Sequence, residues 1–297
     1  MMRKKKERLG ILQWILMAVL LLVTLTMLVP LLHILARSLS DPSQSGSMGG
    51  LEILPRGFSL INYEVIFSNK NLVPSIFNSI FITLVGTVIN IVLTIMAAYV
   101  LTRPNLVGKK ILMCFFIVMM LFDPGIVPEY LVIRSLDLMG TQWSVILSQA
   151  VNVYYLIIMM RYFQAVPTDL CDAAKIDGAG HMRILFSVVA PLSKAGIATL
   201  TMFYGVARWN EYYRSGIYIS SISDVPLQVI LRKFVVDGDT TTLIGTQNLL
   251  DYNALAQLDY TALQYATIIV AIIPILLIYP LVLKYYTKDT LAGGVKG

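Results

Sequence analysis

A polar and aromatic run at the end of an apolar stretch is the part of this chain whose side chains are best suited to hold a ligand. The run consists of Arg208, Trp209, Asn210, Glu211 and Tyr212. Aromatic rings stack on the flat apolar faces of ligands, while guanidinium, amide and carboxylate groups hydrogen-bond to their polar groups. The same residue types also form aromatic belts at membrane surfaces, with Arg208 and Glu211 paired at i, i+3. Both interpretations stay open. Asn78 and Tyr154 are further candidates, for which packing is the alternative.

A second group of residues lies in a polar segment, 164–194, between two apolar runs. Asp169 can cap a helix that begins near Leu170, with Asp172 as its acidic partner three residues later. Gly178 can end this helix in the left-handed conformation, which costs little only for glycine. A second helix is expected from an apolar stripe with helical spacing, formed by Met182, Leu185, Phe186 and Val189.

Two short helices that meet at a glycine would make an angled and rigid element. Its candidate contact residues are Asp172, Ala173, Ala174, Asp177, Gly178, Ala179 and Pro191. The small alanine side chains leave a slim surface that another protein can approach closely. Such an element could pass the movement of a separate ATPase into a membrane, or it could be an ordinary amphipathic helix lying on the membrane surface.

The sequence lacks the groups that most catalytic or ion-coupled mechanisms need. No Gly-x-x-x-x-Gly-Lys-Ser/Thr motif for nucleotide phosphates occurs. The two histidines, His33 and His181, and the two cysteines, Cys114 and Cys171, are too scattered to predict a metal site. Asp123 stands alone in its apolar run, whereas an ion-coupled transporter is expected to carry paired carboxylates there. We therefore expect neither an enzyme nor a bound cofactor.

Composition places these candidates in a membrane protein. The 297 residues are 57% hydrophobic and only 13% charged, with a mean hydropathy of +0.74. A bilayer-spanning helix needs about 20 apolar residues. Six runs of that length occur, at 11–36, 76–101, 111–133, 143–163, 195–216 and 264–286. The predicted fold is therefore all-α with six transmembrane helices, and Asp123-Pro124-Gly125 should interrupt the third.

The distribution of basic residues predicts how the chain is oriented. Most of the 23 lysines and arginines fall in the segments that lie inside if the N-terminus is cytosolic, as the positive-inside rule requires. The first apolar run is too long for a cleaved signal, so we expect a retained anchor. The predicted organisation begins with a cytosolic basic tail at 1–10, helix 1 at 11–36 and an external loop at 37–75. A core of helices 2–6 follows at 76–286 and includes the cytosolic loop 164–194 and the external loop 217–262. A cytosolic tail at 287–297 ends the chain.

The segment Cys171 to Ala179, with Ala190-Pro191-Leu192 downstream, resembles the EAA loop of permease subunits of ATP-binding cassette (ABC) importers. The chain differs from that pattern in having Asp172 for the usual glutamate and Ala190 for the usual leucine. The resemblance extends along most of the chain and is to the carbohydrate-uptake branch of the family. The other segments that carry it are Asn78-Ser79, 97–103, 127–136, Trp209-Asn210, 226–228 and 293–297.

The resemblance implies a permease that forms half of an import pathway for an oligosaccharide or a polysaccharide fragment. The implied partners are an ABC ATPase dimer, a second homologous permease and an extracytoplasmic solute-binding protein, within the lipid of a bacterial plasma (inner) membrane. ATP and Mg²⁺ would bind to the ATPase, and the loop 164–194 would couple its motion to the helices. The net charge of +6 reflects membrane anchoring and predicts no nucleic-acid partner. Import of another small polar solute, an amino acid or phosphate, is the alternative.

Overall fold

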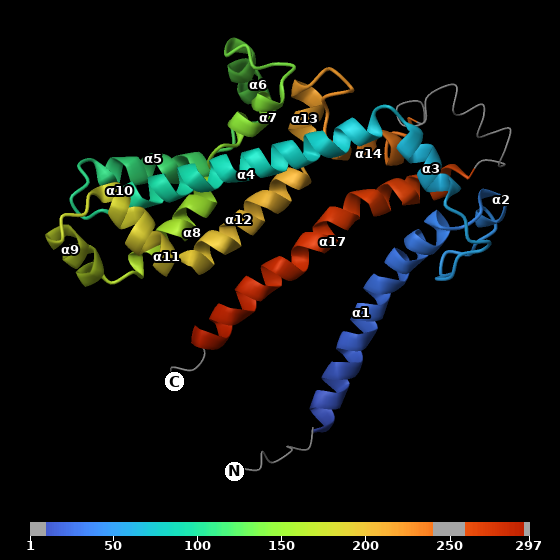
Figure 1. The fold of residues 1–297 in the computed structure, drawn as a ribbon, viewed down its shortest axis with the longest axis horizontal. Helices are drawn as coiled ribbons and strands as arrows, with labels where there is room; N and C mark the ends of the chain where they lie inside the picture. The colour runs from blue at the N-terminus through green and yellow to red at the C-terminus, as the bar shows by residue number, and fades with distance from the viewer. Residues whose placement is uncertain (1–9, 240–258, 294–297) are drawn as a thin grey trace. The chain divides into compact units, whose positions relative to one another are not determined.

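The computed structural model of the chain describes residues 10–239 and 259–293. Every regular element in these residues is a helix, apart from one isolated bridge between Ser40 and Phe58. The chain divides into two compact units, residues 1–69 with 239–270 and residues 70–238 with 271–297. Figure 1 labels the helices of both units.

Three helices in the described residues are long and apolar enough to cross a membrane. They are α1 (Ile11–Ser38), α4 (Leu72–Thr102) and the first part of α17 (Tyr260–Gly293). Three pairs of shorter helices pass the same test together but are bent between their members, so up to six spans are present if each pair crosses as one. The structure therefore supports a helical membrane protein with three to six spans.

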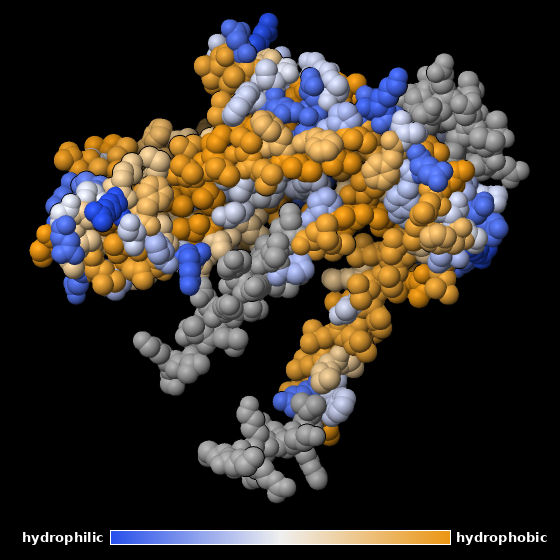
Figure 2. Space-filling view, viewed as in Figure 1, coloured by the Kyte–Doolittle hydropathy of each residue, from blue (hydrophilic) through white to orange (hydrophobic). Residues whose placement is uncertain are grey.

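The first unit contains α1, the short helices α2 (Pro42–Ser45) and α3 (Ile61–Ser68), and the start of α17. Most of α1 exposes apolar side chains, which appear as an orange surface in Figure 2. Only its C-terminal end is buried, at His33, Ala36 and Ser38. A helix with this pattern is stable where lipid or another apolar surface covers it.

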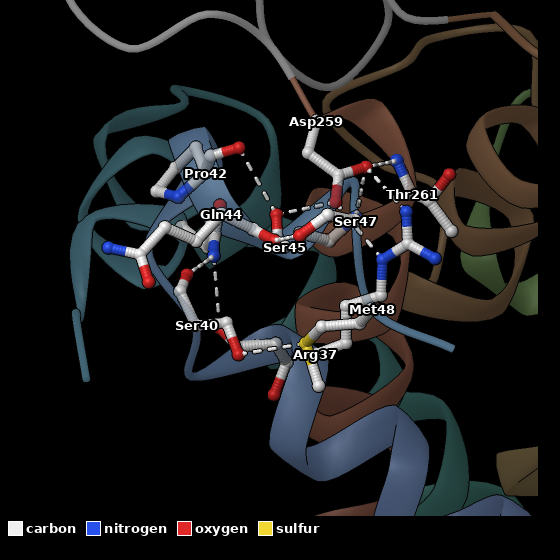
Figure 3. Close-up of polar contacts among 12 residues, drawn as sticks. Arg37, Ser40, Pro42, Gln44, Ser45, Ser47, Met48, Asp259 and Thr261 are labelled. Atoms are coloured by element: carbon white, nitrogen blue, oxygen red, sulfur yellow. Dashed lines mark hydrogen bonds and ion pairs between the residues drawn. The ribbon is translucent and has the colours of Figure 1, made fainter. Parts of the chain in front are cut away.

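A buried carboxylate holds the first unit together. Asp259 accepts hydrogen bonds from Arg37 Nε at 3.0 Å, Arg37 Nη2 at 3.1 Å and Ser45 Oγ at 2.6 Å (Figure 3). It also caps the start of α17 through the backbone N–H of Thr261 at 3.0 Å. Burial alone would raise the pKa of Asp259, but the donors from Arg37 and Ser45 outweigh it and lower the pKa overall. The carboxylate therefore stays ionised, and its contribution to stability is lost only as the pH falls below the usual range near 3.8.

Replacing Asp259 with asparagine is expected to lower the midpoint of thermal unfolding at neutral pH. The substitution keeps the side chain's shape but removes the charge that strengthens the bonds from Arg37, worth about 1.5–3 kcal/mol. Glu52→Gln is the matched control, because the Glu52–Arg56 pair is exposed and such pairs contribute about 0–1 kcal/mol. Thermal unfolding in detergent measures both. Equal unfolding midpoints for the two variants would show that the charge of Asp259 does not stabilise the first unit.

The core of the second unit consists of α4 packed along α8 (Val153–Gln164) and α12 (Lys194–Trp209), which lie side by side in Figure 1. Around these lie α5 (Lys109–Leu121), α6 (Ile126–Ser135), α7 (Gln142–Ser148), α13 (Tyr213–Tyr218) and α14 (Leu227–Val235). Between α8 and α12 the chain forms α9 (Thr168–Ile176), α10 (His181–Ile184), a π-helical turn η1 (Leu185–Val189) and α11 (Ala190–Leu192).

Three of the predicted apolar runs are interrupted, and the first two are 111–133 and 143–163. The predicted interruption at Asp123-Pro124-Gly125 is confirmed: α5 ends at Leu121, α6 begins at Ile126, and the two axes differ by 116°. Gly125 has a φ of +78°, a conformation that suits glycine. The run 143–163 was expected to be one continuous helix. That expectation is wrong, because α7 and α8 are separated at 149–152 and bent by 52°.

The later part of the chain also differs in detail from the prediction. The run 195–216 is interrupted, since α12 ends at Trp209 and α13 starts at Tyr213. Within the predicted loop 217–262 the structure has the helix α14, and Gly238 has the positive φ of a turn, +69°. Residues 240–258 of the predicted loop 217–262, and the basic tail up to residue 9, lie outside the described residues.

A glycine permits the close approach of α12 to α8. Gly196 is buried, and a Cβ built there would collide with the ring of Tyr162. Gly196→Ala is therefore expected to lower thermal stability by about 1–3 kcal/mol, the usual effect of overpacking. Gly216→Ala is the control, because nothing lies within 4 Å of a Cβ at that position. The unfolding midpoints of the two variants in detergent decide the comparison, and an unchanged Gly196→Ala protein would contradict the packing described.

Candidate functional site

The segment 164–194, which we name the coupling segment after the role that the resemblance implies, begins with α9. Pro167, rather than Asp169, occupies the N-cap position, and the structure gives it no side-chain capping bond. The prediction that Asp169 caps the helix is therefore wrong. Asp169 instead lies in the first turn, where a negative charge favours the positive end of the helix. Asp172 forms no capping box either, and its carboxylate lies 2.7 Å from Lys175 Nζ.

The predicted glycine stop at the end of α9 is confirmed. Gly178 has a φ of +80°. Its backbone N–H donates to Lys175 O at 3.0 Å, and that of Ala179 donates to Ala174 O at 2.9 Å. These two bonds are the Schellman arrangement, which satisfies carbonyls that the helix would otherwise leave unpaired. The chain thus turns sharply between α9 and α10.

One face of the coupling segment is attached to the core of the second unit. Cys171 is buried, and Ala174 and Ala179 pack against the same apolar cluster. In α10 and η1 the buried side chains are Ile184, Leu185 and Val189. The cluster continues into α4, α8 and α12 through Ile95, Ala98, Tyr99, Leu101, Leu156, Met159, Met160, Phe163 and Leu200. A force applied to the coupling segment therefore reaches these three helices through close-packed contacts.

The exposed part of the coupling segment carries five large apolar side chains among charged and polar residues. Its exposed fractions are 46% for Leu170, 87% for Ile176, 57% for Met182, 57% for Phe186 and 56% for Leu192. Asp172 and Lys175 lie among them and are also exposed. Apolar and charged side chains accordingly alternate at the α9 end of the molecule in Figure 2. Exposed apolar side chains rimmed by charges are typical of a surface that binds another protein.

The expected apolar stripe of the second helix is split between the two faces. Leu185 and Val189 are buried, whereas Met182 and Phe186 are exposed. Leu185, Phe186 and Val189 lie in the π-helical turn at 185–189, whose i→i+5 bonding is wider than an α-turn and breaks the spacing on which the stripe was predicted. Phe186 thereby joins the exposed face.

Arg208, the most distinctive of the candidate ligand-binding residues, is buried inside the protein, with 3% of its surface exposed. Its guanidinium donates to Asn90 Oδ1 at 3.0 and 3.2 Å and to the carbonyls of Val145 at 2.7 Å, Ile146 at 2.8 Å and Gln149 at 2.9 Å. These carbonyls lie at the C-terminal end of α7, where helical carbonyls lack partners and favour a cation. The pairing of Arg208 with Glu211, one of the two interpretations left open, is not formed, and Glu211 lies near Arg214 instead.

The remaining members of the 208–212 run point in different directions. Trp209 is buried and donates from Nε1 to Ala271 O at 3.2 Å. Glu211 accepts from the backbone N–H of Arg214 at 2.7 Å, and Arg214 Nε lies 2.8 Å from Glu129 on α6. Asn210 and Tyr212 remain exposed, although Asn210 also donates to Val206 O.

The two candidates outside that run also differ from each other. The side-chain amide of Asn78 donates to Ser223 O at 2.8 Å and accepts from Gln142 Nε2 at 2.8 Å, so it ties α4 to α7 and to the segment before α14. Tyr154, in the first turn of α8, is 59% exposed. The structure therefore leaves Tyr154, Asn210 and Tyr212 accessible to a ligand, and it does not bring all seven candidates into one cavity-lining group. Their contact with a substrate stays a prediction.

Asn90 and Gly86 are residues that the sequence analysis missed. Asn90 is a buried polar residue in the middle of α4, and it donates from Nδ2 to Gln149 O at 2.6 Å. A Cβ at Gly86 would lie only 3.0 Å from Arg208 Nε. The available signal was an amide in the middle of a predicted membrane-spanning helix, because a buried polar group requires a partner.

Known proteins resemble this chain over nearly its whole length, although no family model matches it. The polygalacturonan/rhamnogalacturonan transport system permease protein YtcP of Bacillus subtilis is 36% identical over 279 residues, covering 94% of this chain and 96% of that protein. The chain belongs to the family of sugar ABC transporter permeases. The resemblance drawn from the EAA-like segment and the other motifs is thereby confirmed.

Two further comparisons agree with this assignment. The arabinooligosaccharides transport system permease protein AraQ of Halalkalibacterium halodurans is 27% identical over 304 residues, covering 99% of this permease and 100% of that one. In the crystal structure of a bacterial ABC transporter involved in the import of the acidic polysaccharide alginate, one chain superposes with a TM-score of 0.85 at 28% identity. That match covers 92% of this permease and 95% of the other chain.

Proposed function

We propose that this permease forms one half of the pathway by which an ABC importer takes up an oligosaccharide or a polysaccharide fragment. The observation that carries the proposal is the 36% identity to YtcP across 94% of the chain. Further support comes from AraQ and from the alginate importer, because the names of all three transporters refer to sugar chains. The exposed rings of Tyr154 and Tyr212 suit this substrate class, since sugars stack on aromatic surfaces.

The two arginines nearest in sequence to Trp209 give no support to the alternative of phosphate import. Phosphate recognition needs free cationic donors or helix N-termini directed at the ligand. Here the Arg208 guanidinium is directed at Asn90 and at main-chain carbonyls, and Arg214 is paired with Glu129. Both arginines closest in sequence to Trp209 are thus already engaged. Arg232, whose guanidinium lies 4.9 Å from the centre of the Tyr212 ring, is an exposed cation beside that candidate residue.

The proposed mechanism is alternating access driven by a separate ATPase. ATP and Mg²⁺ bind to an ATPase dimer, which holds the exposed face of the coupling segment, and closure of the dimer moves that segment. A second permease completes the pathway, and a solute-binding protein delivers the sugar from outside. This permease supplies no catalytic group in the scheme. Instead, its helices shift between two arrangements, and the binding of its partners changes the populations of these two states.

The proposed topology has six spans with both termini in the cytosol. The bend of 86° between the segment His181–Leu192 and α12 suits a helix that lies along the membrane surface and then meets a crossing helix. With 16 residues, α12 is about 24 Å long, short of the roughly 30 Å hydrocarbon core, so α13 would complete that span. The positive-inside rule places the coupling segment in the cytosol.

Uptake measurements in proteoliposomes test the proposed function. The vesicles contain this permease, the partner permease and the ATPase, and receive the solute-binding protein with a labelled oligogalacturonide or arabino-oligosaccharide. We expect uptake of at least one of the two sugars that requires ATP. Phosphate and an amino acid mixture are the controls. Uptake of a control solute, with neither sugar transported, would contradict the proposal.

A further inference from the structure

The helix α12 connects the coupling segment to the break between α7 and α8. It begins at Lys194, the last residue of the coupling segment. Near that end Leu200 is fully buried in the cluster that holds Ile184 and Leu185, and Ile197 packs against the same cluster. Arg208 lies in the last turn at the other end. The intervening helix contains no proline, so it can move as a rigid rod.

The break between α7 and α8 is held almost entirely by side chains from α12 and α4. Arg208 binds the carbonyls of Val145, Ile146 and Gln149, as described above. Tyr204, one helical turn earlier on α12, accepts from the backbone N–H of Asn152 at 3.1 Å, and its hydroxyl lies 2.8 Å from Thr94 Oγ1 on α4. Both sides of the break are thus bonded to the same end of α12.

These bonds tie the position of the break to the position of α12. The guanidinium is nearly completely buried, and among the described residues no carboxylate lies within ion-pairing distance of it. A buried cation that loses its acceptors is strongly unfavourable. If α12 shifts, the carbonyls of α7 must follow Arg208 or leave its charge without partners, so a joint displacement is favoured.

We propose that Arg208 is a positioning residue that transmits displacement of the coupling segment to the break between α7 and α8. The proposal rests on the function proposed above, because it takes the ATPase to be what moves the coupling segment. It assigns Arg208 to the transmission of movement rather than to contact with the sugar. Tyr154 is exposed and lies in the first turn of α8, directly after the break. Such a movement would reorient this residue.

Gly86 offers a test that leaves the charge in place. A Cβ at Gly86 would lie 3.0 Å from Arg208 Nε and 3.2 Å from its Cδ, so Gly86→Ala presses on the guanidinium from α4. Gly205→Ala on α12 is the matched control, since its Cβ would meet only Thr87 Oγ1 at an ordinary 3.8 Å. Both substitutions improve helix propensity, so a difference between them reports on Arg208.

The experiment measures two quantities in the reconstituted importer. The first is the number of sugar molecules taken up per ATP hydrolysed. The second is the distance between two spin labels, one at Leu147 on α7 and one at Arg161 on α8, both of which are exposed. The exposed Cys114 is replaced by serine so that it takes up no label. The distance is measured with and without trapping of the importer by ATP and vanadate. For the parent importer we expect the distance to change on trapping. Gly86→Ala and Arg208→Gln should lose that change and lower the uptake per ATP about tenfold, while still co-purifying with the ATPase.

Arg208→Lys is expected to fall between the parent and Arg208→Gln, because an ammonium keeps the charge but has three donors in place of the planar fork. Gly205→Ala should behave like the parent protein. If Gly86→Ala and Arg208→Gln match the parent in both uptake per ATP and label distance, the inference about Arg208 is overturned. The proposed function is not affected by that result. Failure of the parent permease itself to co-purify with the ATPase would instead overturn the proposed function, and the inference with it.

Discussion

Ile176→Asp is expected to prevent the ATPase from binding to this permease. Ile176 is 87% exposed at the end of α9, the most exposed apolar side chain of the coupling segment. In the proposed complex it is buried by the ATPase, so aspartate would place an unpaired charge in an apolar contact. The cost of at least about 2 kcal/mol corresponds to a loss of affinity of roughly 25-fold or more. Co-purification with the ATPase and ATP-dependent uptake both measure this effect.

The substitution should leave the fold of the permease unchanged, because the side chain makes no buried contact in the isolated chain. Leu51→Asp is the matched control, since Leu51 is 77% exposed but lies in the segment 37–75, predicted to be external. The control should retain the ATPase. Equal retention of the ATPase by both variants would show that the exposed face of the coupling segment is not the contact surface.

Gly178→Val is expected to reduce sugar uptake about 5- to 30-fold. The φ of +80° at this position places the residue in the left-handed region, where a residue with a Cβ loses about 1–2 kcal/mol and a β-branched one is especially strained. Nothing lies within 4 Å of a Cβ built there, so the effect is purely conformational. Loss of the Schellman arrangement would let α9 tilt away from α10 and change the face presented to the ATPase. Initial rates of uptake measure the result.

Gly180→Val provides the comparison for that substitution. Gly180 lies two residues later, also has nothing within 4 Å of a Cβ, and has an extended conformation with φ of −71° and ψ of 166°. Valine adopts this conformation readily. Uptake by Gly180→Val should therefore match the parent permease. Similar losses in the two variants would mean that added bulk, and not backbone conformation, matters in this turn.

The parts of the fold that the sequence predicts are those determined by local chemistry. The long apolar helices follow from hydropathy, the break at Asp123-Pro124-Gly125 from proline and glycine, and the end of α9 from Gly178. Each of these depends on residues within one or two helical turns. The start of α9 was placed too late because Asp169 is a good capping residue by type, whereas Pro167 takes the position.

The features that the sequence does not predict depend on partners far along the chain. The break between α7 and α8 lies in an apolar run in which Ser148, Gln149 and Asn152 are the polar residues near the break. Its stability comes from Arg208 and Asn90, each 59 residues away from Gln149. This separation along the sequence also explains why the sequence suggested a ligand-binding role for Arg208. Most of its acceptors are main-chain carbonyls, which leave no pattern in the sequence.

The most direct test of this account replaces Ile176 with a photo-reactive amino acid in the intact cell membrane and identifies the cross-linked product by mass spectrometry. The account predicts a cross-link to an ATP-binding cassette subunit, and none to that subunit from the same amino acid in place of Leu51. Cross-links from position 176 only to lipid or to another membrane protein would contradict it. The coupling segment would then be a surface helix that takes no part in energy transfer.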